Sequence, residues 1–281
     1  MTKKGSTVCN CANKIMYTLN PSFYVRVKEK IKGNWGVIFL ASAIISMIST
    51  TLVFSGSIGE FATVFGDLQT YGSQYILQSS KIGRSSNFFG QIFPILIASI
   101  LQLSLNIELI SFLKTGKFQI VNLFRHIQEN PKVIVICGAI MGLIQLVLSS
   151  IPAVGPFAYF VVSFMFIYVG FIVALKKDME IQDYFKESIN LTKGYKMQLF
   201  KVFLHYYLFV ILLSISLLIS VVLMTIGVTG GEIIILIVIG VILFFASAIG
   251  MLVISVRNTP LYLLANAMFF EEQLQHEGIE L

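Results

Sequence analysis

Long apolar runs alternate with short polar segments along the whole chain. A helix needs about 20 predominantly apolar residues to cross a bilayer. The runs that meet this requirement lie at 36–54, 92–113, 133–152, 157–175, 200–228 and 233–256. Because the connections after the third and fifth runs are short, the pattern predicts an all-α, polytopic membrane bundle in which six transmembrane helices form three hairpins.

The polar segments divide this predicted membrane domain, which covers residues 1–281, into parts. Residues 1–35 are predicted to form a cytoplasmic tail and an interfacial helix, and 36–256 the six-span bundle. Residues 55–91 form its one long outer connection, and residues 257–281 a cytoplasmic C-terminal helix. The long connection is rich in Gly, Ser and Gln, so we expect it to be the main outer surface that could meet a ligand.

Three of the polar segments carry apolar residues at helical spacing. In 118–130 these residues are Ile120, Leu123, Phe124 and Ile127, and similar spacing recurs in 23–31 and 181–189. The pattern predicts an amphipathic interfacial helix before each hairpin. Two interpretations stay open: the helices cover the inner ends of the bundle while their lysines reach the headgroups, or one of them docks a cytoplasmic partner.

The positive charges lie on one side of the predicted topology. Of the 20 Lys and Arg residues, all but Lys81 and Arg84 fall in the N-terminal tail, in the second connection, in the fourth connection together with Lys201 at the start of the fifth run, or in the C-terminal segment. Positive residues near span ends resist translocation. Both termini are therefore predicted to be cytoplasmic.

The composition agrees with a membrane protein. Hydrophobic residues make up 56% of the chain and charged residues 12%, whereas soluble domains have about 25% charged residues. The net charge of +6 does not indicate a nucleic-acid partner, because the charges lie between apolar runs and not on a basic folded domain. The N-terminal segment lacks the pattern of a secretory signal, so we expect the first run to be retained as an anchor.

No catalytic or cofactor motif is evident in the sequence. Cys9 and Cys11 have no nearby residues that would complete a metal site. Glu271, Glu272 and His276 are similar to the paired glutamates of membrane prenyl-protein endopeptidases. That family has Arg at the position of His276, and its glutamates precede further histidine-bearing spans. We therefore expect no enzymatic activity, no metal and no cofactor.

The candidate functional residues are polar side chains inside apolar runs, namely Glu108, Gln145 and His205. Such residues are costly in a bilayer and often functional. Contact between Glu108 and His205 is allowed by their similar depth. A belt of aromatic residues and histidine at the inner interface explains His205 without this contact and is favoured for it, whereas for Glu108 an interfacial and a functional position are equally well supported. Gln102 and Asn106 are i, i+4 neighbours, and their spacing favours an interhelical hydrogen bond.

Several short motifs resemble those of one bacterial family. They are Lys-Gly-Asn-Trp-Gly at 32–36, Phe-Lys-Glu-Ser at 185–188, Lys-Gly-Tyr-Lys at 193–196, Thr-Pro-Leu-Tyr at 259–262 and Phe-Phe-Glu-Glu at 269–272. The chain resembles the domain of unknown function 975 family in these motifs. The resemblance implies a multi-pass protein of a bacterial cytoplasmic membrane without an assigned activity, so it implies no functional residue. Trp35 is interpreted as an interfacial anchor.

These observations favour a non-enzymatic membrane protein whose direct surroundings are the lipid bilayer. Candidate roles are an immunity factor, an envelope-stress factor or an accessory subunit that contacts a membrane or cytoplasmic protein through its amphipathic helices. The alternative is a small transporter or permease subunit with a pathway near Glu108, Gln145 and His205. An enzyme that acts on lipid would need a buried acid and base pair.

Overall fold

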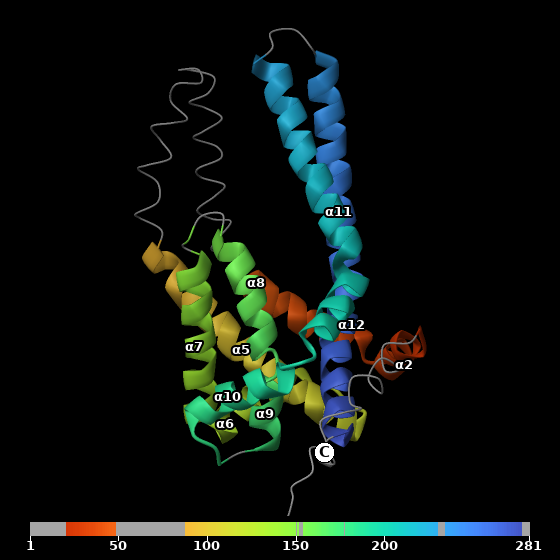
Figure 1. The fold of residues 1–281 in the computed structure, drawn as a ribbon. Coiled ribbons are helices and arrows are strands. Elements are labelled where there is room, and N and C mark those ends of the chain that lie inside the picture. The colour runs from red at the N-terminus through yellow and green to blue at the C-terminus, as the bar shows by residue number, and fades with distance from the viewer. Residues whose placement is uncertain are drawn as a thin grey trace, which may run out of the picture. The chain divides into compact units, whose positions relative to one another are not determined.

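The computed structural model describes residues 21–48, 88–149, 151, 154–176, 178–229 and 234–276. Within these ranges the regular secondary structure is helical and no strand occurs (Figure 1). The all-α prediction is thereby confirmed. The helices are α2 (Pro21–Ile31), Trp35–Ile48, α5 (Phe88–Thr115), α6 (Ile120–Glu129), α7 (Pro131–Ser149), α8 (Val154–Phe166), α9 (Val169–Leu175), α10 (Ile181–Thr192), α11 (Lys196–Thr229) and α12 (Ile234–His276).

Several of these helices have the length and composition of membrane spans, as expected of a multi-pass membrane protein. Among the described residues five qualify, or six if α2 and Trp35–Ile48, which meet at 91°, count as one bent span. The five are Ile92–Thr115, Pro131–Leu148, Ala158–Leu175, Lys196–Gly227 and Ile234–Gln275. The predicted run 36–54 is described only as far as Ile48, and most of the outer connection 55–91, together with Cys9 and Cys11, lies outside the described residues.

The chain divides into two compact units. Unit 1 contains Met1–Phe39 and Lys193–Leu281, and unit 2 contains Leu40–Thr192. In unit 1, α11 and α12 run side by side as a hairpin, and α2 packs against α12 (Figure 1). In unit 2, α5 packs against α6, α7 and α9, while α10 packs against α8 and α9. The helix α5 is therefore the common neighbour of most elements in unit 2.

Glycine allows α7 and α9 to approach α5 closely. A Cβ atom at Gly138 would lie 2.8 Å from the Cα of Ile100, and one at Gly170 would lie 2.6 Å from the Cβ of Asn106. Neither position has room for a larger side chain without movement of α5 or its neighbours. These contacts bring the polar side chains of α5 next to those of the adjacent helices.

Two helix boundaries differ from the sequence prediction. The run 157–175 is interrupted by a turn at Ile167 and Tyr168, which separates α8 from α9. Conversely, α12 continues without a break from Ile234 to His276, although a separate C-terminal helix was expected from 257. Pro260 lies inside α12 and removes one helical hydrogen bond. Close by, the Asn258 side chain donates a hydrogen bond to the Tyr206 carbonyl, which ties α12 to α11 at this level.

Short helices form at the three segments where apolar spacing predicts them. The helix α2 ends before Gly33 and α10 ends before Gly194, and both glycines have a φ of +92°. Glycine adopts this left-handed conformation at little cost, which explains the helix stops. Each short helix buries apolar side chains against the protein, such as Phe23 in α2 and Leu123 in α6. Their position at a membrane interface stays a prediction.

Candidate functional site

Glu108 lies on α5 and is completely buried within unit 2. One carboxylate oxygen, Oε1, accepts hydrogen bonds from the Gln119 backbone N–H at 3.0 Å and from the Asn122 amide at 3.1 Å. The other oxygen, Oε2, lies 2.9 Å from Nε2 of His126. Because a buried carboxylate without partners is strongly destabilising, the two donors and the neighbouring imidazole make the position tolerable.

The partners of Glu108 all belong to α6 or to the residue that precedes it. Gln119 is the N-cap residue of α6, but its side chain makes no capping hydrogen bond. Glu108 therefore accepts the hydrogen bond of an N–H group at this helix start, and its negative charge faces the positive end of the helix dipole. A further hydrogen bond, from the Ser104 hydroxyl to the Leu123 carbonyl, also joins α5 to α6. The polar contacts of Glu108 thus fix α6 against α5.

Sequence reasoning did not assign a role to His126. Gln119, Asn122 and His126 are spaced by three and four residues, so they lie on one face of α6. That polar stripe was the available signal, but its partner on α5 lies 18 positions away from His126 in the sequence. The spacing alone could not show that the stripe faces α5.

His205 lies in unit 1 among aromatic side chains. Its ring stacks on that of Tyr24 with centroids 3.7 Å apart, and it meets Tyr206 edge-on at 5.0 Å. Tyr206 in turn contacts Tyr262 of α12. These contacts are those of an aromatic cluster. The described partners of Glu108 and of His205 lie within the unit of each residue, and contact between the two stays a hypothesis that rests only on their similar depth.

Other residues of unit 1 that the sequence singles out include Glu272, His276 and Trp35, and the contacts described for them join helices or stack rings. Glu272 accepts a hydrogen bond at 2.6 Å from the guanidinium of Arg26, so α12 and α2 are joined by an ion pair. The side chain of His276 lies outside the described residues. Trp35 is the first residue of its helix and is 37% exposed, with its ring stacked on Phe39.

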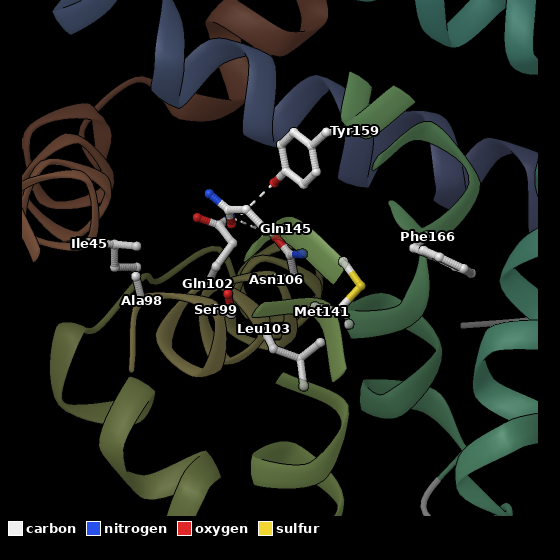
Figure 2. Close-up of a pocket in the computed structure, with 11 residues that line it drawn as sticks. Ile45, Ala98, Ser99, Gln102, Leu103, Asn106, Met141, Gln145, Tyr159 and Phe166 are labelled. Carbon is white, nitrogen blue, oxygen red and sulfur yellow. Dashed lines mark hydrogen bonds between the residues drawn. The ribbon is translucent and has the colours of Figure 1, made fainter. Parts of the chain in front are cut away.

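Gln145 lines a cavity in unit 2 whose volume is about 290 Å³ (Figure 2). The side chains of Gln102, Asn106 and Tyr159 reach the same space. No charged side chain is among the described residues around this space, which we call the amide cavity. Its lining residues are Ile45, Ala98, Ser99, Gln102, Leu103, Asn106, Met141, Gln145, Tyr159, Phe166 and Gly170.

The polar groups of the amide cavity are weakly bonded to one another. The Tyr159 hydroxyl donates to Oε1 of Gln145 at 3.4 Å, and the Gln102 amide donates to Oδ1 of Asn106 at the same distance (Figure 2). Both distances exceed the usual range of about 2.7–3.2 Å. The Gln102–Asn106 bond lies within α5, whereas an interhelical bond was expected. Each amide keeps further donor and acceptor capacity for a ligand.

The described residues offer little for metal chemistry. Among them, no group of three or more His, Cys, Asp and Glu side chains is placed so that it could hold a metal ion. Cys137 is a free thiol and is buried in α7. The chemistry that the described site supports is therefore hydrogen bonding in the amide cavity and ionic anchoring of α6 by Glu108.

Comparisons with protein families, with curated proteins and with solved structures find no match to this chain. The resemblance to the domain of unknown function 975 family accordingly stays a prediction, and the site must be interpreted from its own geometry.

Proposed function

We propose that this protein is a non-enzymatic, multi-pass protein of a bacterial cytoplasmic membrane that binds a small uncharged solute in the amide cavity, as a small transporter or permease subunit. The observation that carries the proposal is the convergence of Gln102, Asn106, Gln145 and Tyr159 on one cavity between apolar helices. Hydrogen-bonding groups are costly among such helices unless they face a partner or a cavity.

The lining of the amide cavity defines the class of solute. With no charged group among the described lining residues, an ion would lose its hydration without compensation. Carboxamides both donate and accept hydrogen bonds, so they suit amides and polyols. The volume of about 290 Å³ is just below the roughly 300–1,000 Å³ of drug-sized sites. A solute of a few hydrogen-bonding groups fits these limits.

In this proposal Glu108 does not line the solute pathway, although the sequence suggested a pathway near this residue. Its carboxylate is occupied by α6, and it lies two positions after Asn106 on α5. We infer that it holds α5 and α6 together beside the cavity and does not contact the solute. The six-span topology, the three hairpins and the cytoplasmic termini complete the proposal, supported by the one-sided distribution of Lys and Arg.

Solute entry into proteoliposomes tests this function. Stopped-flow light scattering would follow the entry of glycerol, erythritol, urea and acetamide into liposomes that contain the purified full chain. We expect Gln145→Leu to lower the protein-dependent rate of at least one solute by about tenfold, because lost hydrogen bonds cost about 1–2 kcal/mol. The matched control is Gln182→Leu, at an exposed position of α10. Rates equal to those of protein-free liposomes would contradict the proposal.

A second candidate function, the accessory subunit, is favoured by the outer face of α6. Val121 is 75% exposed and Phe124 57% exposed, although the opposite face of α6 is packed on the protein. A nitroxide label at Phe124→Cys, with all native cysteines replaced by Ser, would show what covers this face in liposomes. If the label collides with oxygen but not with a polar nickel chelate, this face of α6 is covered by lipid. That result would argue against a surface for a cytoplasmic partner. Access to the chelate leaves the face open to a cytoplasmic protein.

A further inference from the structure

A second cavity in unit 2 has a volume of about 220 Å³ and lies at one end of its helices. It is lined near the C-terminal ends of α5 and α9 by Lys114 and Ala174, and near the start of α7 by Ile134. We call it the rim cavity. Its described lining residues are Ile107, Ile110, Ser111, Lys114, His126, Glu129, Asn130, Ile134, Val173 and Ala174.

The lining of the rim cavity changes from apolar to charged. Ile107 and Ile110 lie one to two turns inside the end of α5, whereas Lys114 lies next to its last residue. Apolar spans end where a bilayer passes into its headgroups. A cavity with one apolar side and one ionic side suits a ligand that has an apolar part and an ionic part. A phospholipid is such a ligand.

The ionic side of the rim cavity presents both signs of charge. Lys114 supplies an ammonium group that forms no ion pair with any described residue. Glu129 supplies a carboxylate, whose Oε1 lies 2.9 Å from Nε of Arg125 and whose Oε2 lies 4.0 Å from Nδ1 of His126. His126 is already bonded through Nε2 to Glu108. The cavity therefore offers one available cation and one carboxylate with unused acceptor sites.

We propose that the rim cavity binds the headgroup of a zwitterionic aminophospholipid, such as phosphatidylethanolamine. The phosphate faces Lys114 and the primary ammonium donates to Glu129, while the glycerol and first acyl carbons lie along Ile107 and Ile110. A headgroup with only negative charge would meet the Glu129 carboxylate. A choline headgroup has no N–H to donate to it. The cavity is smaller than sites for drug-sized ligands, so it suits the headgroup and the atoms next to it, while the rest of the acyl chains stays outside.

Binding of an acyl-labelled fluorescent phosphatidylethanolamine to the purified full chain in neutral detergent tests the proposal. Fluorescence anisotropy gives the affinity, and unlabelled phosphatidylcholine and phosphatidylglycerol compete. Because half-exposed ionic contacts are weak, we expect Lys114→Gln and Glu129→Gln each to lower the affinity by about two- to fivefold. Lys117→Gln and Glu180→Gln, at exposed positions outside the cavity lining, should leave it unchanged. Thermal unfolding midpoints confirm that each variant is folded.

The selectivity of the variants separates an ionic site from a general loss of structure. Glu129→Gln should improve binding of phosphatidylglycerol relative to phosphatidylethanolamine, since it removes the repelling carboxylate. Soluble glycerophosphoethanolamine should compete at least about tenfold less well than the lipid, because it lacks the acyl carbons that meet the isoleucines. Equal affinity for the three lipids, unchanged affinity in both variants, or full competition by the soluble headgroup would each overturn the proposal.

Discussion

In unit 2, 61% of the apolar stretch of α5 is buried within the protein, whereas in unit 1 the corresponding values are 6% for α11 and 11% for α12. The most buried of the five candidate spans, α5, has the lowest mean hydropathy, and the two least buried, α11 and α12, have the two highest values. In a bilayer the surface of a protein is as apolar as its core or more so. The most apolar helices are therefore expected to face lipid, and the helix with polar residues to be enclosed by protein.

The two units also differ in how they use polar residues. Unit 2 encloses a carboxylate, several carboxamides and two cavities around α5. In unit 1 the hairpin α11–α12 has smaller polar contacts, such as the hydrogen bond from Ser247 to Ser216 at 2.9 Å. Among the described residues, polar side chains and cavities are thus concentrated in unit 2, while the hairpin of unit 1 presents an apolar surface suited to lipid.

Removal of the Glu108 carboxylate should give the largest effect. Glu108→Ala leaves the Gln119 N–H, the Asn122 amide and the His126 ring without their acceptor. Breaking a buried ionic network by loss of one partner costs about 3–5 kcal/mol. We expect this loss in the free energy of unfolding measured by titration with sodium dodecyl sulfate in mixed micelles, together with faster amide hydrogen exchange in α6.

The matched control for this change is Glu187→Ala, also in unit 2. Glu187 pairs with Lys176 at 2.8 Å, but both side chains are partly exposed. Exposed pairs contribute about 0–1 kcal/mol. If the two variants lost the same free energy, or if α6 exchange were unchanged in Glu108→Ala, Glu108 would not be the anchor of α6.

The fold could be predicted further than the site. Apolar runs of about 20 residues and apolar positions at helical spacing depend only on neighbours in the sequence, so the helices α2, α6 and α10 were located. Gly33 and Gly194, which follow the ends of α2 and α10, are local signals as well, because glycine adopts a positive φ at little cost. The turn at Tyr168 is absent from the prediction because the apolar pattern runs through it unchanged. The continuity of α12 is absent because the apolar run ends before Arg257, where a change in hydropathy was interpreted as a change of helix.

Within the site, the sequence singled out Gln145, Gln102 and Asn106 as polar residues in apolar runs, but it did not show that they share one cavity with Tyr159. A polar residue inside an apolar run can be recognised in a sequence. Which helix its side chain faces, however, depends on how the helices pack. The close approach of α9 to α5 at Gly170 and Asn106 is one such packing feature. The Glu108–His126 contact depends in the same way on the docking of α6. These pairings are tertiary, and helical spacing carries no information about them.

A lysine in the middle of α11 tests the apolar surface of unit 1. Leu212 lies near the midpoint of Lys196–Gly227 and is 52% exposed. If this surface faces hydrocarbon, Leu212→Lys should raise the free energy of insertion by about 2.5–3.5 kcal/mol. The fraction of chains that insert α11 into microsomes measures this free energy. Glycosylation of tags on the flanking segments reports that fraction. Met197→Lys is the control, because a lysine near the end of the span can reach the headgroups. Equal insertion of both variants would show that α11 does not face hydrocarbon at Leu212.

A pair of glycine substitutions should give the smallest effect and compares the packing of the two units directly. In unit 2, a Cβ at Gly138 would lie 2.8 Å from the Cα of Ile100, so backbone must move. In unit 1, a Cβ at Gly250 would meet only the Leu213 side chain, at 3.1 Å. Because overpacking against backbone costs about 1–3 kcal/mol, Gly138→Ala should lower the free energy of unfolding by that amount. Gly250→Ala should change it by less than about 0.5 kcal/mol, since a leucine side chain can shift. Equal losses in the same detergent titration would mean that α11 and α12 pack as rigidly as α5 and α7.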